Sequence, residues 1–102
     1  MTWLPGQATD LHDHGGSAGA FVVVSGEVVE QTVREGALVD SALRQGQGRQ
    51  FGAHHVHRIC NVGARPAVTV HAYGPALREI TRYRLHGGRL AAESVTRAGE
   101  DW

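Results

Sequence analysis

Three histidine-bearing segments carry residue types and spacings that could do chemistry. The first is His12-Asp13-His14. If residues 9–14 form a strand, the two imidazoles project from the same face, because side chains alternate along a strand. Two imidazoles about 7 Å apart at their Cα atoms can converge on one metal ion. Asp13 would face the other way, so we do not expect it to bind that ion.

The second segment is His54-His55-Val56-His57. His55 and His57 share one face of a predicted strand, and His54 lies on the other. Histidines from two neighbouring barrel strands could complete a set of three ligands. Three neutral imidazoles without a carboxylate favour Zn, Fe, Cu or Ni over hard cations such as Mg or Ca. The residues alone do not choose among those metals.

The third segment places Thr69, His71 and Tyr73 at every second position. A strand would put the hydroxyl, the imidazole and the phenol on one face. In such a line Thr69 could fix the tautomer of His71, and His71 could orient the Tyr73 hydroxyl. The alternative is a strand that buries polar groups which only satisfy one another, and the pattern favours neither interpretation.

Short β-branched segments between glycine-rich turns must position these side chains. The predicted strands cover residues 20–24, 27–33, 37–44, 56–62, 67–73, 80–85 and 89–96. The Ser25-Gly26 turn predicts a hairpin between the first two of them. Residues 37–44 could instead form two helical turns. Strands this short, at this spacing, predict an all-β sandwich or barrel in one domain over residues 1–96, with a C-terminal tail over 97–102.

Composition excludes several classes of protein. The ten basic residues balance ten acidic ones, so the chain lacks the positive charge of a nucleic-acid-binding surface. No apolar run approaches the ~20 residues of a membrane span, and the N-terminus lacks the pattern of a secretory signal. The single cysteine, Cys60, excludes an internal disulfide and fits a reducing compartment. We therefore expect a cytoplasmic protein.

The three segments together resemble the cysteine dioxygenase type I family of the cupin superfamily. The resemblance runs from Trp3 to about Tyr83. Its motifs are W-x2-G-x2-T-x2-HDH over residues 3–14, HRICN over 57–61 and PAVTVHAYGP over 66–75. Family membership implies a double-stranded β-helix, or jelly-roll barrel, that binds one non-haem Fe(2+) and adds both atoms of O2 to a thiolate.

By this resemblance, His12, His14 and His57 are the expected metal ligands. Thr69, His71 and Tyr73 match the family's Ser-His-Tyr catalytic relay, with threonine keeping the hydroxyl. Trp3 matches a tryptophan that packs close to this relay. His54 and His55 are then expected to serve in a loop or beside the ligands. The implied reaction oxidises L-cysteine with O2 to cysteine sulfinic acid.

The chain departs from the family pattern at three places. Gly19 stands where animal members have a cysteine that crosslinks to the relay tyrosine. Cys60 stands where the family often has Glu, and we interpret it as a small buried residue. The family's substrate-carboxylate arginine lies in a segment before the tryptophan that has no match here, so the expected barrel is truncated at its N-terminus. Arg58 is the nearest cation in sequence, but it matches a different position.

These departures leave two alternatives to cysteine oxidation. The substrate could be another small thiol, such as 3-mercaptopropionate, because substrate choice depends on the carboxylate anchor. The chain could also be a non-catalytic metal-binding or small-ligand-binding cupin, or a truncated remnant of an enzyme. An uncovered barrel edge could pair with a second copy, so we expect a monomer or a weak homodimer.

Overall fold

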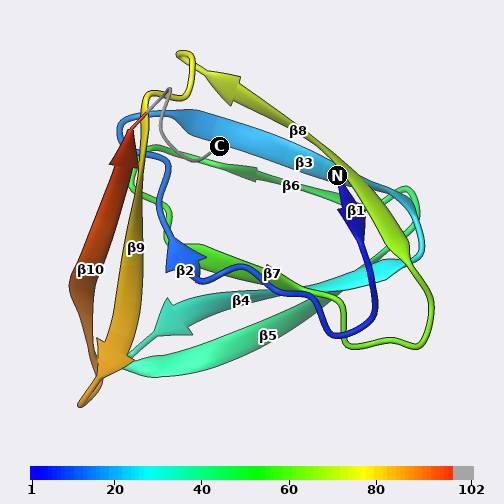
Figure 1. The fold of residues 1–102 in the computed structure, drawn as a ribbon, viewed down its shortest axis with the longest axis horizontal. Coiled ribbons are helices and arrows are strands. Elements are labelled where there is room, and N and C mark those ends of the chain that lie inside the picture. The colour runs from blue at the N-terminus through cyan, green and yellow to red at the C-terminus, as the bar shows by residue number, and fades with distance from the viewer. Residues whose placement is uncertain (98–102) are drawn as a thin grey trace.

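The strand-rich sequence folds into two antiparallel sheets that face each other (Figure 1). A computed structural model describes residues 1–97. The first sheet has the order β1-β8-β3-β6 and the second has the order β10-β9-β2-β7-β4-β5. This architecture is the all-β jelly roll that the sequence predicts.

The four-stranded sheet consists of β1 (Thr2–Trp3), β3 (Ala18–Ser25), β6 (Gly48–Phe51) and β8 (Ala67–Gly74). The six-stranded sheet consists of β2 (Leu11–His12), β4 (Glu27–Arg34), β5 (Ala37–Arg44), β7 (His57–Cys60), β9 (Glu79–His86) and β10 (Arg89–Arg97). None of the described residues forms a helix of the length and apolarity that a membrane crossing requires.

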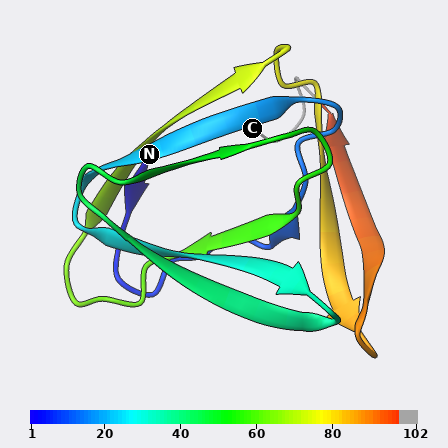
Figure 2. The same cartoon turned by 180° about the vertical axis from the view of Figure 1, so that it is seen from behind.

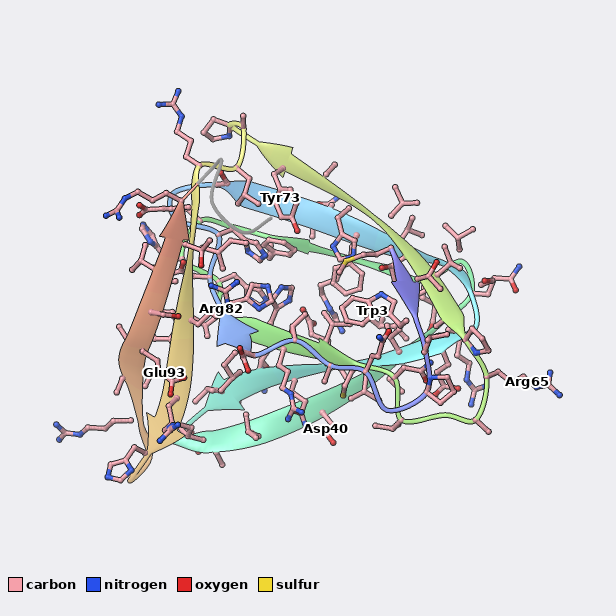
Figure 3. All side chains as sticks on the ribbon, in the orientation of Figure 1. Trp3, Asp40, Arg65, Tyr73, Arg82 and Glu93 are labelled. Atoms are coloured by element: carbon pink, nitrogen blue, oxygen red, sulfur yellow. The ribbon has the colours of Figure 1, made fainter. Side chains whose placement is uncertain are left out.

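The hydrophobic core lies between the two sheets and draws its members from both of them. Its buried members are Trp3, Phe21, Val23, Val28, Leu43, Phe51, Ile59 and Ala67, with Tyr73 packed against them. Burying one large apolar side chain contributes roughly 1.5–3 kcal/mol, so this cluster is the main attraction between the sheets. The sticks in Figure 3 show Trp3 and Tyr73 inside the barrel and Arg65 extending away from it.

The predicted hairpin between residues 20–24 and 27–33 is wrong. β3 pairs with β6 and β8, whereas β4 pairs with β5 and β7 in the other sheet. The chain therefore crosses between the sheets at Gly26, which has a φ of 78°. A hairpin turn and a crossing of this kind both require a residue with positive φ, so the Ser25-Gly26 signal cannot separate them.

Other strand predictions differ from the structure mainly in length. Residues 37–44 form β5, so the helical alternative does not occur. The strand predicted over 9–14 is only Leu11–His12, and His14 lies beyond its end. The two-residue β1 and the glycine-flanked β6 were not predicted at all. Of the expected tail, Arg97 belongs to β10 and residues 98–102 lie outside the described residues.

The β9–β10 hairpin stands at an angle to the rest of the six-stranded sheet and closes one side of the barrel (Figures 1 and 2). It joins the sheet through β2, where Leu11 pairs with Tyr83 and His12 pairs with Arg82. This attachment brings a strand from late in the chain beside the first histidine segment.

The crossing at Gly26 predicts a stability difference between two glycines. A Cβ at Gly26 would lie 2.8 Å from the Pro66 carbonyl oxygen and 2.9 Å from the Ala67 Cα, whereas Gly46, also at positive φ, has nothing within 4 Å. Gly46→Ala is expected to cost about 1–2 kcal/mol through conformation alone. Gly26→Ala should cost about 1–3 kcal/mol more, because backbone must shift. Urea unfolding of both variants tests this, and equal losses would contradict the close packing at the crossing.

Candidate metal centre

Sheet pairing brings the first two histidine segments together. His12 on β2 lies directly opposite His57 on β7. Side chains at directly opposed positions of an antiparallel pair have their Cβ atoms only about 4.5–5.5 Å apart. His14 follows β2 and is almost fully buried, as is His57. The structure thus assembles the three predicted ligands from β2, the turn after it, and β7.

The three rings form a nearly equilateral cluster. The ring centroids are 4.9 Å apart for His12 and His14, 4.9 Å for His12 and His57, and 5.0 Å for His14 and His57. One ring nitrogen from each residue lies within 4.8 Å of the others, which is compact enough for the three to share one ion. His14 meets His12 and His57 edge-on, at interplanar angles of 81° and 77°, and the rings of His12 and His57 are tilted at 58°.

Hydrogen bonds leave a nitrogen of each ring available for a metal. His12 Nδ1 lies 2.8 Å from the Asp10 carbonyl oxygen, and His57 Nδ1 lies 2.8 Å from Glu30 Oε2, so Nε2 remains on both rings. Both nitrogens of His14 are buried without a hydrogen-bond partner. An unsatisfied buried polar atom costs roughly 1–3 kcal/mol. The donor set therefore fits a metal ion that prefers imidazole.

Burial keeps the imidazoles of His12 and His14 in the neutral form that binds metals. Burial lowers the pKa of His12 to about 4, partly against the effect of the Asp10 carbonyl. Burial and the neighbouring His12 and His57 lower the pKa of His14 to about 3. At neutral pH no proton has to leave either ring before a metal binds.

A second cluster of possible ligands, formed by Glu30, His55 and His57, overlaps the first. Here, however, the polar atoms already bond to one another. Glu30 Oε2 accepts from His57 Nδ1 at 2.8 Å and lies 3.3 Å from His55 Nε2, while Glu30 Oε1 accepts from Arg49 Nε at 3.0 Å. The guanidinium opposes a second cation, so we interpret this cluster as a hydrogen-bond network beside the metal centre.

Asp13 faces away from the three rings, as the alternation of the sequence predicts. Its carboxylate accepts a 2.6 Å hydrogen bond from the Tyr83 hydroxyl and further bonds from the backbone N–H groups of Gly15 and Thr81. The Asp13 carboxylate raises the pKa of Tyr83 to about 12. These contacts fasten the segment that carries His12 and His14 to β9.

The third predicted segment lies on β8, across the barrel from the histidines. Trp3 Nε1 donates a 2.9 Å hydrogen bond to Thr69 Oγ1, which lies 2.8 Å from His71 Nε2. Burial lowers the pKa of His71 to about 4. The rings of His71 and Tyr73 stack with their centroids 6.4 Å apart. Hydrogen bonding from His71 to the Tyr73 phenol stays a prediction.

A cavity of about 390 Å³ connects the histidines with this relay. It is lined by Met1, Trp3, Ala8, Thr9, Asp10, His12, His14, His57, Ile59, His71, Tyr73, Ile80 and Arg82. The position of Arg82 could not be predicted from the sequence, because its approach to His12 depends on the register of β2 against β9. Its guanidinium bonds to the Thr96 hydroxyl on β10. Figure 3 shows Arg82 pointing into the barrel interior.

Arg58, the cation nearest in sequence, does not line this cavity. Its guanidinium donates to the Thr9 carbonyl oxygen at 3.0 Å and to Gln31 Oε1 at 3.2 Å. Cys60 is buried, as expected, and burial raises the pKa of its thiol. Neither residue is placed to contact a ligand in the cavity.

Gly19 leaves room for two aromatic rings beside the centre. A Cβ at this position would lie 2.6 Å from Phe51 Cζ and 2.9 Å from Tyr73 Cδ1. Phe51 in turn stacks on His14 with centroids 5.0 Å apart. The missing side chain at residue 19 is thus part of how Tyr73 and His14 are packed.

Comparison with known families now decides the relationship. The family description of cysteine dioxygenase type I matches residues 1–86. The chain belongs to this family. Membership, together with the histidine cluster, supports a cupin-type oxygenase or metal-binding role and implies a metal cofactor. No curated protein matched the sequence.

Solved structures agree on the fold. The protein TT1209 from Thermus thermophilus is 30% identical, with a TM-score of 0.63 over 72% of this chain and 67% of its own. A protein from Klebsiella pneumoniae, described by its double-stranded β-helix domain, is 20% identical, with a TM-score of 0.66 over 91% of this chain and 70% of its own. An oxalate oxidase is 21% identical, with a TM-score of 0.63 over 71% of this chain and 38% of its own. The chain thus spans well under half of the oxalate oxidase.

The lowered histidine pKa values predict acid sensitivity of the metal-free protein. In the folded state the pKa is about 4 for His12 and His71 and about 3 for His14, against about 6.5 in an unfolded chain. The contribution of these three groups to the free energy of unfolding is therefore fully present above pH 6.5. It decreases as the pH falls toward 4, because the unfolded chain takes up protons that the folded chain excludes.

Urea unfolding of the metal-free protein at pH 7.0 and 4.5 measures this loss. The variant His71→Gln removes one of the three groups and should lose less stability between the two pH values than the wild type does. Equal stability of the wild type at both pH values would show that burial does not keep these rings neutral.

Proposed function

We propose that this protein is an Fe(2+)-dependent thiol dioxygenase that oxidises L-cysteine to cysteine sulfinic acid. The observation that carries the proposal is the buried, hydrogen-bond-free His14 ring beside His12 and His57, at the end of a cavity that also holds Tyr73 and Arg82. The balanced reaction adds one O2 to one thiol, so that R–SH becomes R–SO2H without an external reductant.

His12, His14 and His57 would hold the iron through neutral imidazoles. When bound, ferrous iron would supply the redox chemistry toward dioxygen and the positive charge that lowers the pKa of the substrate thiol. Three protein ligands leave other coordination positions for small molecules, which suits a reaction between a thiol and O2. The neutral rings need no proton loss to bind the metal at pH 7.

Arg82 is the best candidate to bind the substrate carboxylate. It lines the cavity beside His12, its side chain is 30% exposed, and its nearest carboxylate is that of the exposed Asp10, 3.9 Å from Nε. A guanidinium binds a carboxylate through paired, charge-assisted hydrogen bonds. Trp3, Ile59 and Ile80 supply apolar walls that would exclude water around the thiol. This set favours a small thiol that carries a carboxylate.

Tyr73 would act as a hydrogen-bond donor at the reacting atoms. Burial raises the pKa of its phenol, so the hydroxyl keeps its proton at neutral pH. The Tyr73 ring lies 4.9 Å from the His14 ring, centroid to centroid, and packs on Phe51. The hydrogen-bonded chain of Trp3, Thr69 and His71 would hold the neighbouring part of β8 in place.

A panel of thiols tests both the activity and the role of Arg82 in binding the substrate carboxylate. Protein reconstituted with Fe(2+) without oxygen should consume O2 and form sulfinate with L-cysteine, and should act poorly on cysteamine, which lacks a carboxylate. Arg82→Gln should raise the KM for cysteine roughly 10–100-fold, equivalent to about 1.4–2.7 kcal/mol. Arg84→Gln, on the same strand but exposed and paired with Glu93, is the matched control and should leave KM unchanged.

Preferential turnover of 3-mercaptopropionate would show that this thiol is the substrate and would leave the proposed dioxygenase reaction unchanged. Iron-loaded protein that consumes no O2 with any small thiol would overturn the enzymatic proposal in favour of a binding protein.

Replacing Tyr73 tests the proposed hydrogen-bond donor. Tyr73→Phe removes only the hydroxyl, so the packing against His14 and Phe51 persists. We expect kcat to fall roughly 100-fold or more, as is usual when a donor to the transition state is lost. Bound iron, measured by metal analysis, should match the wild type. An unchanged kcat would remove Tyr73 from the reaction.

A further inference from the structure

Glu30 is a carboxylate in the barrel interior that the proposed reaction does not use. Its side chain is 2% exposed, although charged residues are seldom fully buried without partners. It lies on β4, and its register partner on β7 is Ile59, two residues from His57. The side chain reaches diagonally along β7 to His57, a contact that sheet geometry permits for long side chains.

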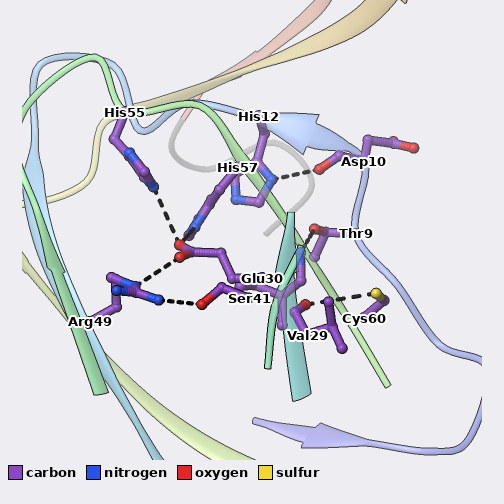
Figure 4. A network of polar contacts seen from close by, with 11 residues as sticks. Thr9, Asp10, His12, Val29, Glu30, Ser41, Arg49, His55, His57 and Cys60 are labelled. Carbon is purple, nitrogen blue, oxygen red and sulfur yellow. Dashed lines mark hydrogen bonds and ion pairs between the residues drawn. The ribbon is translucent and has the colours of Figure 1, made fainter. Parts of the chain in front are cut away.

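The two oxygens of Glu30 have different partners. Oε2 accepts the 2.8 Å hydrogen bond from His57 Nδ1 and also lies 3.3 Å from His55 Nε2. Oε1 accepts from Arg49 Nε at 3.0 Å, and the other end of that guanidinium donates to the Ser41 hydroxyl at 2.7 Å. Figure 4 shows Glu30 between the two histidines on one side and Arg49 on the other.

These partners keep Glu30 ionised. The Arg49 guanidinium, which is always charged, lies 3.0 Å from Oε1, and His57 Nδ1 lies 2.8 Å from Oε2, so both oxygens meet a donor that favours the carboxylate form. A full negative charge therefore lies against the Nδ1 side of His57, opposite the nitrogen available to a metal. A carboxylate in that position fixes the tautomer and increases the electron-donating strength of the imidazole.

The three candidate ligands consequently differ in their second partner. His12 Nδ1 faces a neutral backbone carbonyl of Asp10, and both nitrogens of His14 lack a partner. Among the three, His57 alone is bonded to a charged group in the described part of the chain. A metal bound here would therefore lie near a negative charge that is hydrogen-bonded to one of its ligands, although imidazole itself is an uncharged ligand.

We propose that Glu30 is a positioning residue of the metal centre, which orients His57 and sets its donor strength, and that Arg49 limits this effect by sharing the carboxylate. The inference rests on the metal centre of the proposed function and extends it to residues outside the cavity. Arg49 and Glu30 should therefore affect the metal centre in opposite directions. The Glu30 carboxylate places negative charge beside His57, and the Arg49 guanidinium partly offsets that charge.

Metal affinity and reduction potential test the role of Glu30 without relying on turnover. Glu30→Gln keeps a hydrogen-bond acceptor of the same size but removes the charge. The dissociation constant for Fe(2+), measured by competition with a chelator in the absence of oxygen, should rise roughly 10–100-fold, the range seen when such partners are replaced. The Fe(3+)/Fe(2+) potential should shift upward, because lost negative charge favours the ferrous state.

Arg49→Gln provides the second, independent variant. Arg49 is 39% exposed in its side chain, so its replacement is less disruptive to folding than a change at buried Glu30. The variant leaves the carboxylate in place without its cation, and the potential should shift downward. Glu27→Gln is the matched control, because it removes a carboxylate from the same strand at an exposed ion pair with Arg44. It should change neither quantity.

Three outcomes are distinguishable. Opposite shifts of the reduction potential in Glu30→Gln and Arg49→Gln support the proposal. If Glu30→Gln does not fold, a downward shift in Arg49→Gln supports the proposal and no shift overturns it. A Glu30→Gln protein with wild-type affinity and potential, or shifts of the same sign in both variants, overturns it, because a purely structural role predicts no opposition. Wild-type protein that binds neither Fe(2+) nor Co(2+) would instead remove the metal centre itself.

Discussion

Three imidazoles converge in a place where hydrogen bonds do not satisfy all of their nitrogens. His14 carries most of this cost, since neither of its nitrogens finds a protein partner. Burial lowers the pKa of His12 and His14, so these two rings are uncharged at neutral pH, which avoids the repulsion that two imidazolium groups would cause at 4.9 Å between centroids. The surrounding structure can be understood as the set of contacts that makes this unfavourable arrangement stable.

Those contacts are of three kinds: backbone pairing between strands, hydrogen bonds, and aromatic packing. The register of β2 against β7 places His12 opposite His57. Asp13 then ties the same segment to β9 through Tyr83, and the Asp10 carbonyl and the Glu30 carboxylate fix two of the rings. Aromatic packing completes the site, because Phe51 stacks on His14 where Gly19 leaves space. These contacts come from β3, β4, β6 and β9 and from the segments on either side of β2, so elements of both sheets position the centre.

Local signals in the sequence predicted much of this arrangement. Alternation placed His12 and His14 on one side and Asp13 on the other, and β-branched runs located the long strands of both sheets. Glycine at a turn could not predict which strand the chain would pair with next, so the hairpin at Gly26 was wrong. Arg82 and Glu30 were missed for a related reason. Their approach to His12 and His57 depends on pairing between strands distant in sequence, which one chain without its fold does not reveal.

The β9–β10 hairpin has a consequence for how such a protein can diversify. The hairpin carries Arg82 but contributes no imidazole to the cluster, and it meets the rest of the sheet through two residue pairs of the short β2. Under the proposed function, metal binding and substrate selection would therefore rest on separate pieces of backbone. Mutations in the hairpin would then change which small molecules bind and leave the three imidazoles untouched, so a barrel of this kind could acquire a new substrate by changing one peripheral hairpin.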